Sequence, residues 1–270
     1  MKNTDDLLTL AKVAALAAGE QIKEHYENFT LTLKADRSPL TSADLAANEA
    51  IIKILSQSGL PVCSEEKILE PKSCENLERF WLVDPLDGTK EFIAKNGEFC
   101  VCIALIENER PMLGVIFIPH TNELFYASEG GAFKEILDAK GKILARTNLR
   151  QSRQNGKNFI LLSHRSKSLK AKSIAAKLSL NHAKIGSAIK FCRLAEGSGG
   201  VYARFSPSCL WDNAAGDAIV CFSGGTVVDA STHLPPRYDI KTLSSPHFIA
   251  LSRENLGLLE PILDLCEDKI

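Results

Sequence analysis

The stretch of this chain that most constrains its fold is residues 81–92, WLVDPLDGTKEF, where an apolar run leads directly into two carboxylates. The run predicts a buried strand that ends at Asp84 and Asp87, three positions apart. Two buried carboxylates repel each other unless a cation lies between them. Mg²⁺, a hard ion that takes oxygen ligands, suits such a pair. The alternative is a hydrogen-bonded Asx turn capped by Gly88, with no metal.

The composition is ordinary for a globular protein: 270 residues, 45% hydrophobic and 24% charged, with a formal net charge of −1. This length allows a large core, in one domain or in two lobes. The charge balance gives no basis for a nucleic-acid partner or a polybasic membrane anchor. The first 26 residues have no uninterrupted apolar core, so we expect neither a signal peptide nor a transmembrane segment. We predict a cytoplasmic protein, with a peripheral association with the inner membrane surface left open.

Eight cysteines are scattered through apolar runs, without a C-x-x-C pair. Such usage is typical of reduced, buried thiols in a cytosolic protein rather than of a disulfide framework. Cys100 and Cys102 alternate along one predicted strand, so their side chains point to the same side. Two thiols make no zinc site unless two more ligands lie nearby.

Hydrophobic periodicity predicts an opening helix over 5–27 and a second helix that follows a capping-box pattern at Thr41–Asp44 and ends at Gly59. The first half then continues as short strands with an antiparallel meander, and the second half alternates strands with helices. The later strands are expected at 61–63, 99–106, 112–118, 123–127, 158–162, 183–186, 200–204, 226–229 and 247–251, and the later helices near 168–178, 187–197, 211–223 and 254–267. We place a lobe boundary between residues 154 and 155.

Further carboxylates stand at the ends of predicted elements, and each has a purely structural interpretation. Asp44 fits the reciprocal position of the capping box, and Asp212 fits a helix N-cap. Glu65 and Glu66 follow a short strand and fit a solvated pair in a loop. The joint hypothesis is that these groups converge with Asp84 and Asp87 on two or more Mg²⁺ ions.

A site of this kind suits the hydrolysis of a phosphate ester. Metal ions lower the pKa of a bound water and neutralise the phosphate and the leaving oxygen. The chain has no Cys-x₅-Arg loop, no Walker A motif and no G-x-S-x-G elbow. Direct attack by a metal-activated water is therefore favoured over a covalent intermediate.

Four segments together resemble the signatures of the inositol monophosphatase-like, lithium-sensitive phosphatase superfamily, in the family's order. They are residues 39–44 (PLTSAD), 64–66 (SEE), 84–89 (DPLDGT) and 211–216 (WDNAAG). Within the superfamily, residues 90–92 (KEF), 96–99 (NGEF) and 186–192 (GSAIKFC) are similar to the CysQ-type 3′(2′),5′-bisphosphate nucleotidases. The resemblance implies a layered α/β/α/β/α sandwich, with an α+β lobe over residues 1–154 and an α/β lobe over 155–270.

The resemblance also implies the metal ligands. Glu65, Asp84 and the carbonyl of Leu86 would hold a first Mg²⁺, and Asp84, Asp87 and Asp212 a second. Two or three ions are expected in all, and Li⁺ is expected to inhibit by displacing one. Glu65, Leu86, Asp87 and Asp212 would thereby also border the bound substrate.

The catalytic roles carried over from the resemblance fall on Asp44, Thr89 and Glu66. Asp44 and Thr89 would orient and deprotonate the attacking water, with Thr89 relaying its proton toward Asp44. Glu66 would not act on the water itself but would position the groups that do. The backbone N–H groups of Gly88 and Thr89 would meet the phosphate as a small anion-binding nest.

The resemblance to the nucleotidase branch implies that the second lobe contacts the nucleotide and its second phosphate through His164, Ser187, Lys190 and Arg204. From the residues alone, Lys190 and Arg204 fit surface cations equally well. A second phosphate does need cations outside the metal site, and Lys or Arg supplies them.

The predicted function is Mg²⁺-dependent removal of the 3′-phosphate from adenosine 3′,5′-bisphosphate, with phosphoadenosine phosphosulfate as a second substrate. This activity would clear a by-product of sulfate activation. An inositol or sugar monophosphatase is the alternative enzyme, and a non-catalytic nucleotide sensor is the alternative of another class. The expected partner is a small-molecule nucleotide bisphosphate, and both a monomer and a homodimer remain open.

Overall fold

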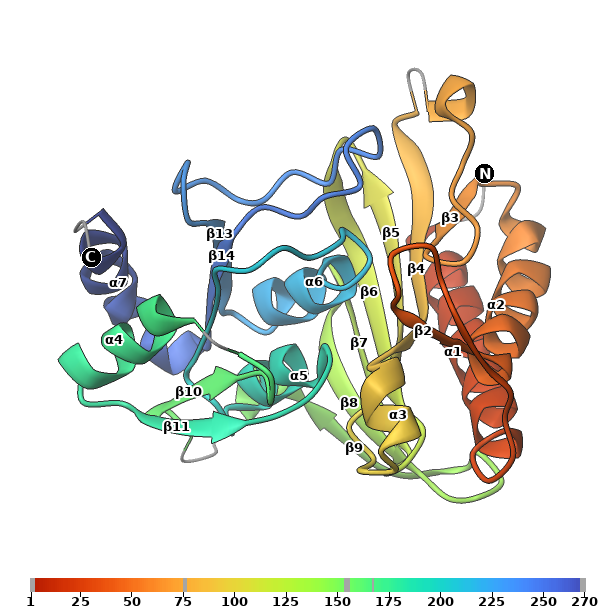
Figure 1. Cartoon of the computed structure of the whole chain (residues 1–270), viewed down its shortest axis with the longest axis horizontal. Helices are drawn as coiled ribbons and strands as arrows, with labels where there is room; N and C mark the ends of the chain where they lie inside the picture. The colour runs from red at the N-terminus through yellow and green to blue at the C-terminus, as the bar shows by residue number, and fades with distance from the viewer. Residues whose placement is uncertain (1–2, 75–76, 153–155, 167, 268–270) are drawn as a thin grey trace.

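Two β-sheets and three helical layers alternate across the molecule (Figure 1). The structure, a computed structural model, describes residues 3–74, 77–152, 156–166 and 168–267. The predicted α/β/α/β/α sandwich is confirmed. Its helices are α1 (Thr4–Glu24), α2 (Ser42–Leu55), α3 (Thr89–Ile93), α4 (Leu169–Lys177), α5 (Ile189–Glu196), α6 (Ala214–Phe222) and α7 (Leu259–Glu267).

The first sheet has seven strands in the order β3-β4-β5-β6-β7-β8-β9. β3 runs parallel to β4, and the other neighbours are antiparallel. Its strands are β3 (Val62–Ser64), β4 (Arg79–Asp87), β5 (Cys100–Glu107), β6 (Arg110–Ile118), β7 (Glu123–Ser128), β8 (Gly131–Leu137) and β9 (Ile143–Asn148).

Both faces of this sheet are buried, and β5 shows how. Val101 and Ile103 belong to one core with residues of α1 and α2, whereas Cys100, Cys102 and Ala104 belong to another with residues of α5 and α6. Side chains alternate between faces along a strand, so an apolar run can serve two helical layers at once. The continuous hydrophobic strands of the sequence follow from this sandwich.

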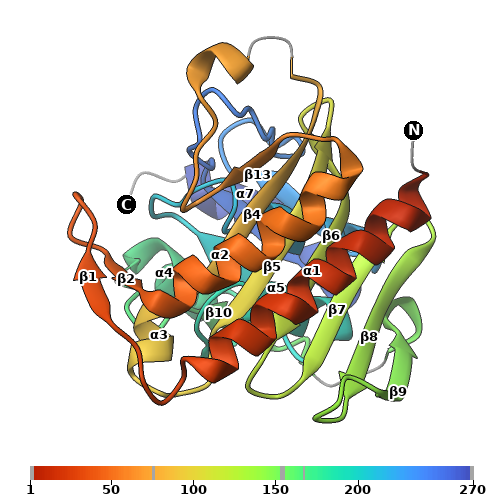
Figure 2. The same ribbon diagram turned by 90° about the vertical axis from the view of Figure 1, so that its right-hand side faces the viewer.

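α1 and α2 lie side by side across the outer face of the seven-stranded sheet (Figure 2). Four of the buried α1 residues are alanines, which allow the helix to approach the sheet closely. The predicted opening helix is confirmed. Among the described residues, no helix is both long enough and apolar enough to cross a membrane.

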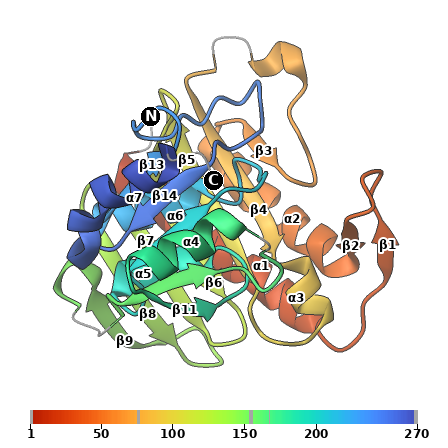
Figure 3. The same ribbon diagram turned by 60° about the vertical axis from the view of Figure 1, so that its left-hand side comes forward.

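The second sheet has the strand order β11-β10-β12-β14-β13. β10 runs parallel to β11 and β12, while β14 is antiparallel to both its neighbours. α4 and α7 cover its outer face, and α5 and α6 lie between the two sheets (Figure 3). The strands are β10 (Phe159–Leu162), β11 (Asn181–Lys184), β12 (Val201–Arg204), β13 (Thr226–Asp229) and β14 (Phe248–Leu251).

An ion-pair network ties α5 to the seven-stranded sheet. Glu123 on β7 and Glu196 on α5 both pair with Lys134 on β8 and with Arg193 on α5. Both carboxylates are largely buried, so the network is shielded from solvent screening. The helix that carries Lys190 is therefore fixed against the seven-stranded sheet.

The structure differs from the sequence-based expectations in its edge elements. β8 and β9 extend the meander, and a hairpin of β1 (Leu31–Leu33) and β2 (Pro39–Thr41), which was not expected, lies between the first two helices. β9 is exposed along most of its length, which leaves no alternating apolar pattern. The C-terminal helix begins as a 3₁₀ helix, Arg253–Leu258. The predicted boundary at 154/155 lies outside the described residues.

Candidate active site

A bulge at the end of β4 carries the two central carboxylates. The register with β5 shifts between Asp84 and Asp87, where Pro85 cannot donate to the ladder. Asp84 is buried, and its Oδ1 accepts the N–H of Leu86 at 3.0 Å, which is an Asx turn. Asp87 instead accepts the N–H of Ala188, which immediately precedes α5, at 2.5 Å. The Asx-turn alternative thus describes Asp84 in part but does not account for Asp87.

Gly88 turns the chain from the bulge into α3. It has φ of 96°, and a Cβ there would lie 3.0 Å from the carbonyl oxygen of Glu98. Both features exclude most other residues. The glycine thereby sets Thr89 at the first position of α3, facing α2.

Asp44 serves two purposes with its two oxygens. Oδ2 accepts the N–H of Thr41 at 2.8 Å and its hydroxyl at 2.5 Å, which completes the predicted capping box. Oδ1 accepts the hydroxyl of Thr89 at 3.1 Å. Burial raises the pKa of Asp44 above its usual value, although these hydrogen bonds oppose the shift. The capping box is therefore present without using the whole carboxylate.

Lys34, between β1 and β2, holds the acidic pair at the end of β3. Its ammonium donates to Glu65 at 2.6 Å and to Glu66 at 2.7 Å. The side chain of Glu66 is largely buried, and burial raises its pKa despite Lys34. The solvated-pair interpretation is wrong for Glu66.

Asp212 comes from the loop before α6. It accepts the N–H of Cys209 at 3.2 Å, and the N-cap of α6 is Asn213, which makes no side-chain cap. The N-cap interpretation of Asp212 is therefore wrong. Arg204, at the end of β12, lies 3.9 Å from the Asp212 carboxylate.

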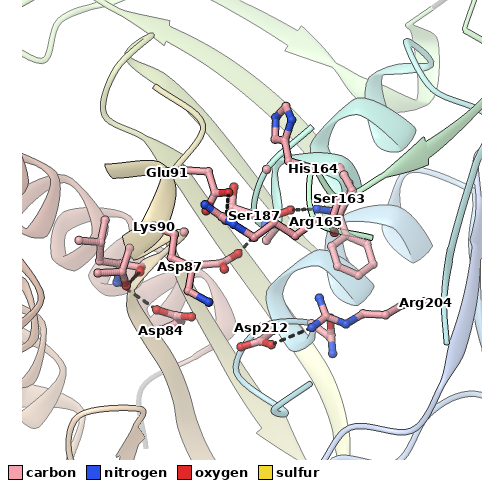
Figure 4. Close-up of a pocket in the computed structure, with 18 of the residues that line it drawn as sticks. Asp84, Asp87, Lys90, Glu91, Ser163, His164, Arg165, Ser187, Arg204 and Asp212 are labelled. Atoms are coloured by element: carbon pink, nitrogen blue, oxygen red, sulfur yellow. Dashed lines mark hydrogen bonds and ion pairs between the residues drawn. The ribbon is translucent and has the colours of Figure 1, made fainter. Parts of the chain in front are cut away.

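These elements surround one cavity of about 310 Å³ (Figure 4). Asp44 and Glu66 stand behind its wall, through their contacts with Thr89 and with Lys34 and Glu65. All the other predicted site residues line it: Glu65, Asp84, Leu86, Asp87, Gly88, Thr89, His164, Ser187, Lys190, Arg204 and Asp212.

The carboxylates destabilise one another. Burial, followed by the charges of Glu65, Asp87 and Asp212, raises the pKa of Asp84 well above its usual value. Burial and the charge of Asp212 raise the pKa of Asp87 to about 7. Burial also raises the pKa of Asp212 to about 6, against the opposing effect of Arg204.

Converging anions of this kind bind cations. The donors are carboxylate oxygens, with the Leu86 carbonyl beside them at the cavity wall. Hard divalent ions such as Mg²⁺ take oxygen ligands of this type. The residues present therefore fit the Mg²⁺ that the motif predicts.

The basic residues predicted to contact the substrate are not all free to bind a ligand. Lys190 is 1% exposed and donates to the carbonyls of Ile185 at 3.1 Å and Ser187 at 2.5 Å. The surface-cation interpretation of Lys190 is wrong. His164, which lines the cavity, contacts Glu98 at 2.5 Å.

Three further charged residues at the cavity were not among the predicted site residues. Arg165 donates to Glu91 at 2.6 Å, which links the segment after β10 to α3 (Figure 4). Lys90 is exposed at the cavity, and its ammonium has no partner among the residues that the structure describes. In the sequence, Lys90 follows Thr89 and Arg165 follows His164, and this adjacency to predicted site residues is the signal that could have indicated them. Neighbours of a site in the sequence enter it only when the local backbone turns them inward.

The fold and the site define a known class. Residues 3–260 match the model of the inositol monophosphatase family, and the chain belongs to that family, whose members are metal-dependent phosphatases. The chain is 39% identical to the 3′(2′),5′-bisphosphate nucleotidase CysQ of Escherichia coli K12 over 228 residues, which are 82% of this chain and 90% of the relative. It is 41% identical to the CysQ of Buchnera aphidicola, over 81% of this chain and 83% of that one.

Solved structures agree in fold. The crystal structure of CysQ from Bacteroides thetaiotaomicron superimposes with a TM-score of 0.82 at 37% identity, covering 93% of this chain and 98% of that one. An IMPase/NADP phosphatase complexed with Mg²⁺ and phosphate has a TM-score of 0.73 at 18% identity, covering 93% of this chain and 91% of that one. At that identity the second likeness concerns the fold alone.

Proposed function

We propose that this chain is a Mg²⁺-dependent 3′(2′),5′-bisphosphate nucleotidase that converts adenosine 3′,5′-bisphosphate to AMP and phosphate. The observation that carries the proposal is the set of carboxylates converging on a cavity whose opposite wall bears cations. The identity to CysQ over most of the chain supports the nucleotide as substrate. Phosphoadenosine phosphosulfate is the second proposed substrate, and clearing a by-product of sulfate activation is the proposed role.

Glu65, Asp84 and the Leu86 carbonyl would hold one Mg²⁺, and Asp84, Asp87 and Asp212 another. When bound, the ions supply charge neutralisation and an acidified water. We propose two or three ions, with Li⁺ inhibiting by displacing one.

Thr89 and Asp44 act on the attacking water. In the proposed step, the Thr89 hydroxyl takes a proton from the water while its own proton passes to Asp44 Oδ1, its acceptor at 3.1 Å. The water oxygen bonds to phosphorus, the bond from phosphorus to the ribose 3′-oxygen breaks, and that oxygen gains a proton from solvent. The capping bonds to Oδ2 fix the carboxylate, and Glu66 supports the adjoining wall. The N–H groups of Gly88 and Thr89 would meet the phosphate.

A phosphate-release screen tests the proposed reaction. With excess Mg²⁺, we expect kcat/KM for adenosine 3′,5′-bisphosphate to exceed that for inositol 1-phosphate and for sugar monophosphates by about 10²-fold or more, because only the bisphosphate meets both the carboxylates and the opposing cations. Li⁺ is expected to lower the rate. A preference for inositol 1-phosphate would favour the alternative enzyme, and nucleotide binding without phosphate release would favour a sensor.

Arg165 and Lys90 extend the proposed substrate site beyond His164, Ser187, Lys190 and Arg204. They lie at the cavity from opposite lobes, and neither is committed to a backbone carbonyl. An arriving phosphate can compete with Glu91 for the Arg165 guanidinium because both are anions that accept paired N–H groups. We propose that these two cations bind the 5′-phosphate.

Arg165→Ala is expected to raise KM for adenosine 3′,5′-bisphosphate by about 10- to 100-fold, the loss of one or two charge-assisted hydrogen bonds. KM for 3′-AMP, which lacks the second phosphate, should change little. The matched control is Lys140→Ala, which removes a cation from an exposed turn away from the cavity. Equal losses on both nucleotides would contradict the assignment of Arg165.

None of the eight cysteines is paired in a disulfide. Unpaired thiols are typical of reducing compartments, which supports our proposal that the protein works in the cytoplasm. Cell fractionation tests a peripheral association with the inner membrane. Light scattering distinguishes a monomer from a homodimer.

A further inference from the structure

Two thiols lie behind the carboxylates of the active site. The antiparallel register of β4 and β5 sets Cys100 opposite Asp87 and Cys102 opposite Asp84. The Cys100 and Cys102 sulfurs are 3.8 Å apart, and Cys100 Sγ lies 4.0 Å from Asp87 Oδ2. These three donor atoms all lie within 4.8 Å of one another, and among the described residues they are the one such group with three metal-ligating side chains. A pair of thiols thus adjoins a predicted Mg²⁺ ligand.

The spacing of this group matches that of a tetrahedral metal centre. With Zn–S bonds of about 2.3 Å, two sulfurs on one tetrahedral Zn²⁺ are about 3.8 Å apart, so the thiols need not move. In such a centre a sulfur and a carboxylate oxygen are about 3.5 Å apart, so Asp87 Oδ2, which lies 4.0 Å from Cys100 Sγ, must approach by about half an ångström or more. Ser187 Oγ, 3.5 Å from Cys100 Sγ, lies where a fourth ligand or a water can complete the shell. The sequence alone placed no further ligands beside Cys100 and Cys102. In the structure, Asp87 from β4 and Ser187 from the segment before α5 lie beside Cys100.

The group adjoins the cavity, although both thiols are buried, and its carboxylate is already oriented. Asp87 and Ser187 line the cavity wall, and both contact Cys100. The N–H of Ala188 donates to Asp87 Oδ2 and fixes the oxygen that faces the thiol. Outer hydrogen bonds of this kind orient metal ligands.

We propose that Cys100, Cys102 and Asp87 form a binding site for Zn²⁺, distinct from the predicted Mg²⁺ set except for the shared Asp87. Zn²⁺ and its thiophilic analogue Cd²⁺ accept thiolates, whereas Mg²⁺ prefers oxygen ligands alone. Binding releases one proton from each thiol to solvent and changes no oxidation state. Because Asp87 serves both sites, Zn²⁺ bound here inhibits hydrolysis. This inhibitory consequence rests on the proposed function, whereas the binding site itself does not.

Titration of the full-length, reduced, chelator-treated protein with Cd²⁺ tests the site without any substrate. The expected result is a saturable thiolate-to-Cd²⁺ charge-transfer band with one ion per chain, and displacement of Cd²⁺ by Zn²⁺. Cys100→Ala and Cys102→Ala should each weaken binding by at least about tenfold, since each removes one of three protein ligands. Cys63→Ala, at an equally buried cysteine of β3, is the matched control and should bind as the unchanged chain does.

Thermal melting shows whether each variant folds, and Cys→Ala is a small change in a core. If Cys100→Ala fails to fold, comparison of the charge-transfer band between the unchanged chain and Cys102→Ala still tests the site. Absence of the band at stoichiometric Cd²⁺, or its full retention in both variants, overturns the site. Zn²⁺ inhibition of phosphate release should weaken by about tenfold or more in both variants. Binding without inhibition overturns the shared role of Asp87, and absence of any phosphatase activity contradicts the proposed function but leaves the Cd²⁺ result standing.

Discussion

Asp87→Asn is expected to lower kcat for adenosine 3′,5′-bisphosphate by about 10³-fold or more at saturating Mg²⁺. The change removes a charged ligand while keeping the size of the side chain and its acceptor for the N–H of Ala188. Metal-ion catalysis stabilises the transition state by several kcal/mol, and each 1.4 kcal/mol is about tenfold in rate. Steady-state phosphate release at several Mg²⁺ concentrations measures the loss.

A second readout separates lost catalysis from lost folding. Burial raises the pKa of Asp87 from its usual value of 3.8 to about 7, so in the metal-free protein ionisation of this carboxyl destabilises the folded state as the pH rises between these two values, and the loss is complete above pH 7. Asparagine carries no such charge, so the metal-free variant should melt no lower than the unchanged chain at pH 8. The stabilisation that Mg²⁺ gives the unchanged chain should be reduced.

Asp264→Asn, at an exposed position of α7, is the control and should change neither readout. Near wild-type hydrolysis by Asp87→Asn at saturating Mg²⁺ would contradict the role of this carboxylate.

Features set by local chemistry could be predicted from the sequence. The capping box at Thr41 and Asp44 depends on residues three apart, and the structure has it. The turn after β4 needs Gly88 because of its positive φ and the nearby Glu98 carbonyl. The layered fold followed from the family resemblance, and the two-faced burial of β5 explains its continuous apolar run.

Features set by contacts between segments far apart in the sequence could not be predicted in the same way. Arg165 meets Glu91 over a separation of 74 residues, and nothing in either segment encodes that partner. The same holds for the approach of Ser187 to Cys100. The packing of the five-stranded sheet and α5 against the seven-stranded sheet brings these groups together.

Burial also reverses what a side chain's type suggests. Lys190 is a cation on a short helix, yet it is buried and its ammonium binds two carbonyls near the start of α5. Glu135 on β8 is likewise buried, where it accepts from Lys12 and Tyr126. The buried carboxylate of Glu135 interrupts the alternation of apolar and polar residues along β8, so the sequence pattern does not predict this strand.

Removing the Thr89 hydroxyl should reduce turnover without weakening substrate binding. In the proposed step this hydroxyl joins the attacking water to Asp44, and general acid–base groups contribute about 10²- to 10⁴-fold. We expect Thr89→Val to lower kcat within that range and to leave KM within about threefold, since the lost interaction acts on the transition state. Mutation of Thr89 tests the proton relay more directly than mutation of Asp44, because Asp44 also completes the capping box of α2.

Thr89→Ser tests whether the hydroxyl itself is needed, because serine keeps the Oγ and loses only the methyl group. Serine should restore kcat to within about tenfold of the unchanged chain, whereas valine, which is nearly the same size as threonine, should not. Thr147→Val, on the exposed strand β9, removes a hydroxyl far from Asp44 and should leave kcat unchanged. Equal kcat in the valine and serine variants would contradict a proton relay through Thr89. A rise in KM with unchanged kcat would instead assign Thr89 to substrate binding alone.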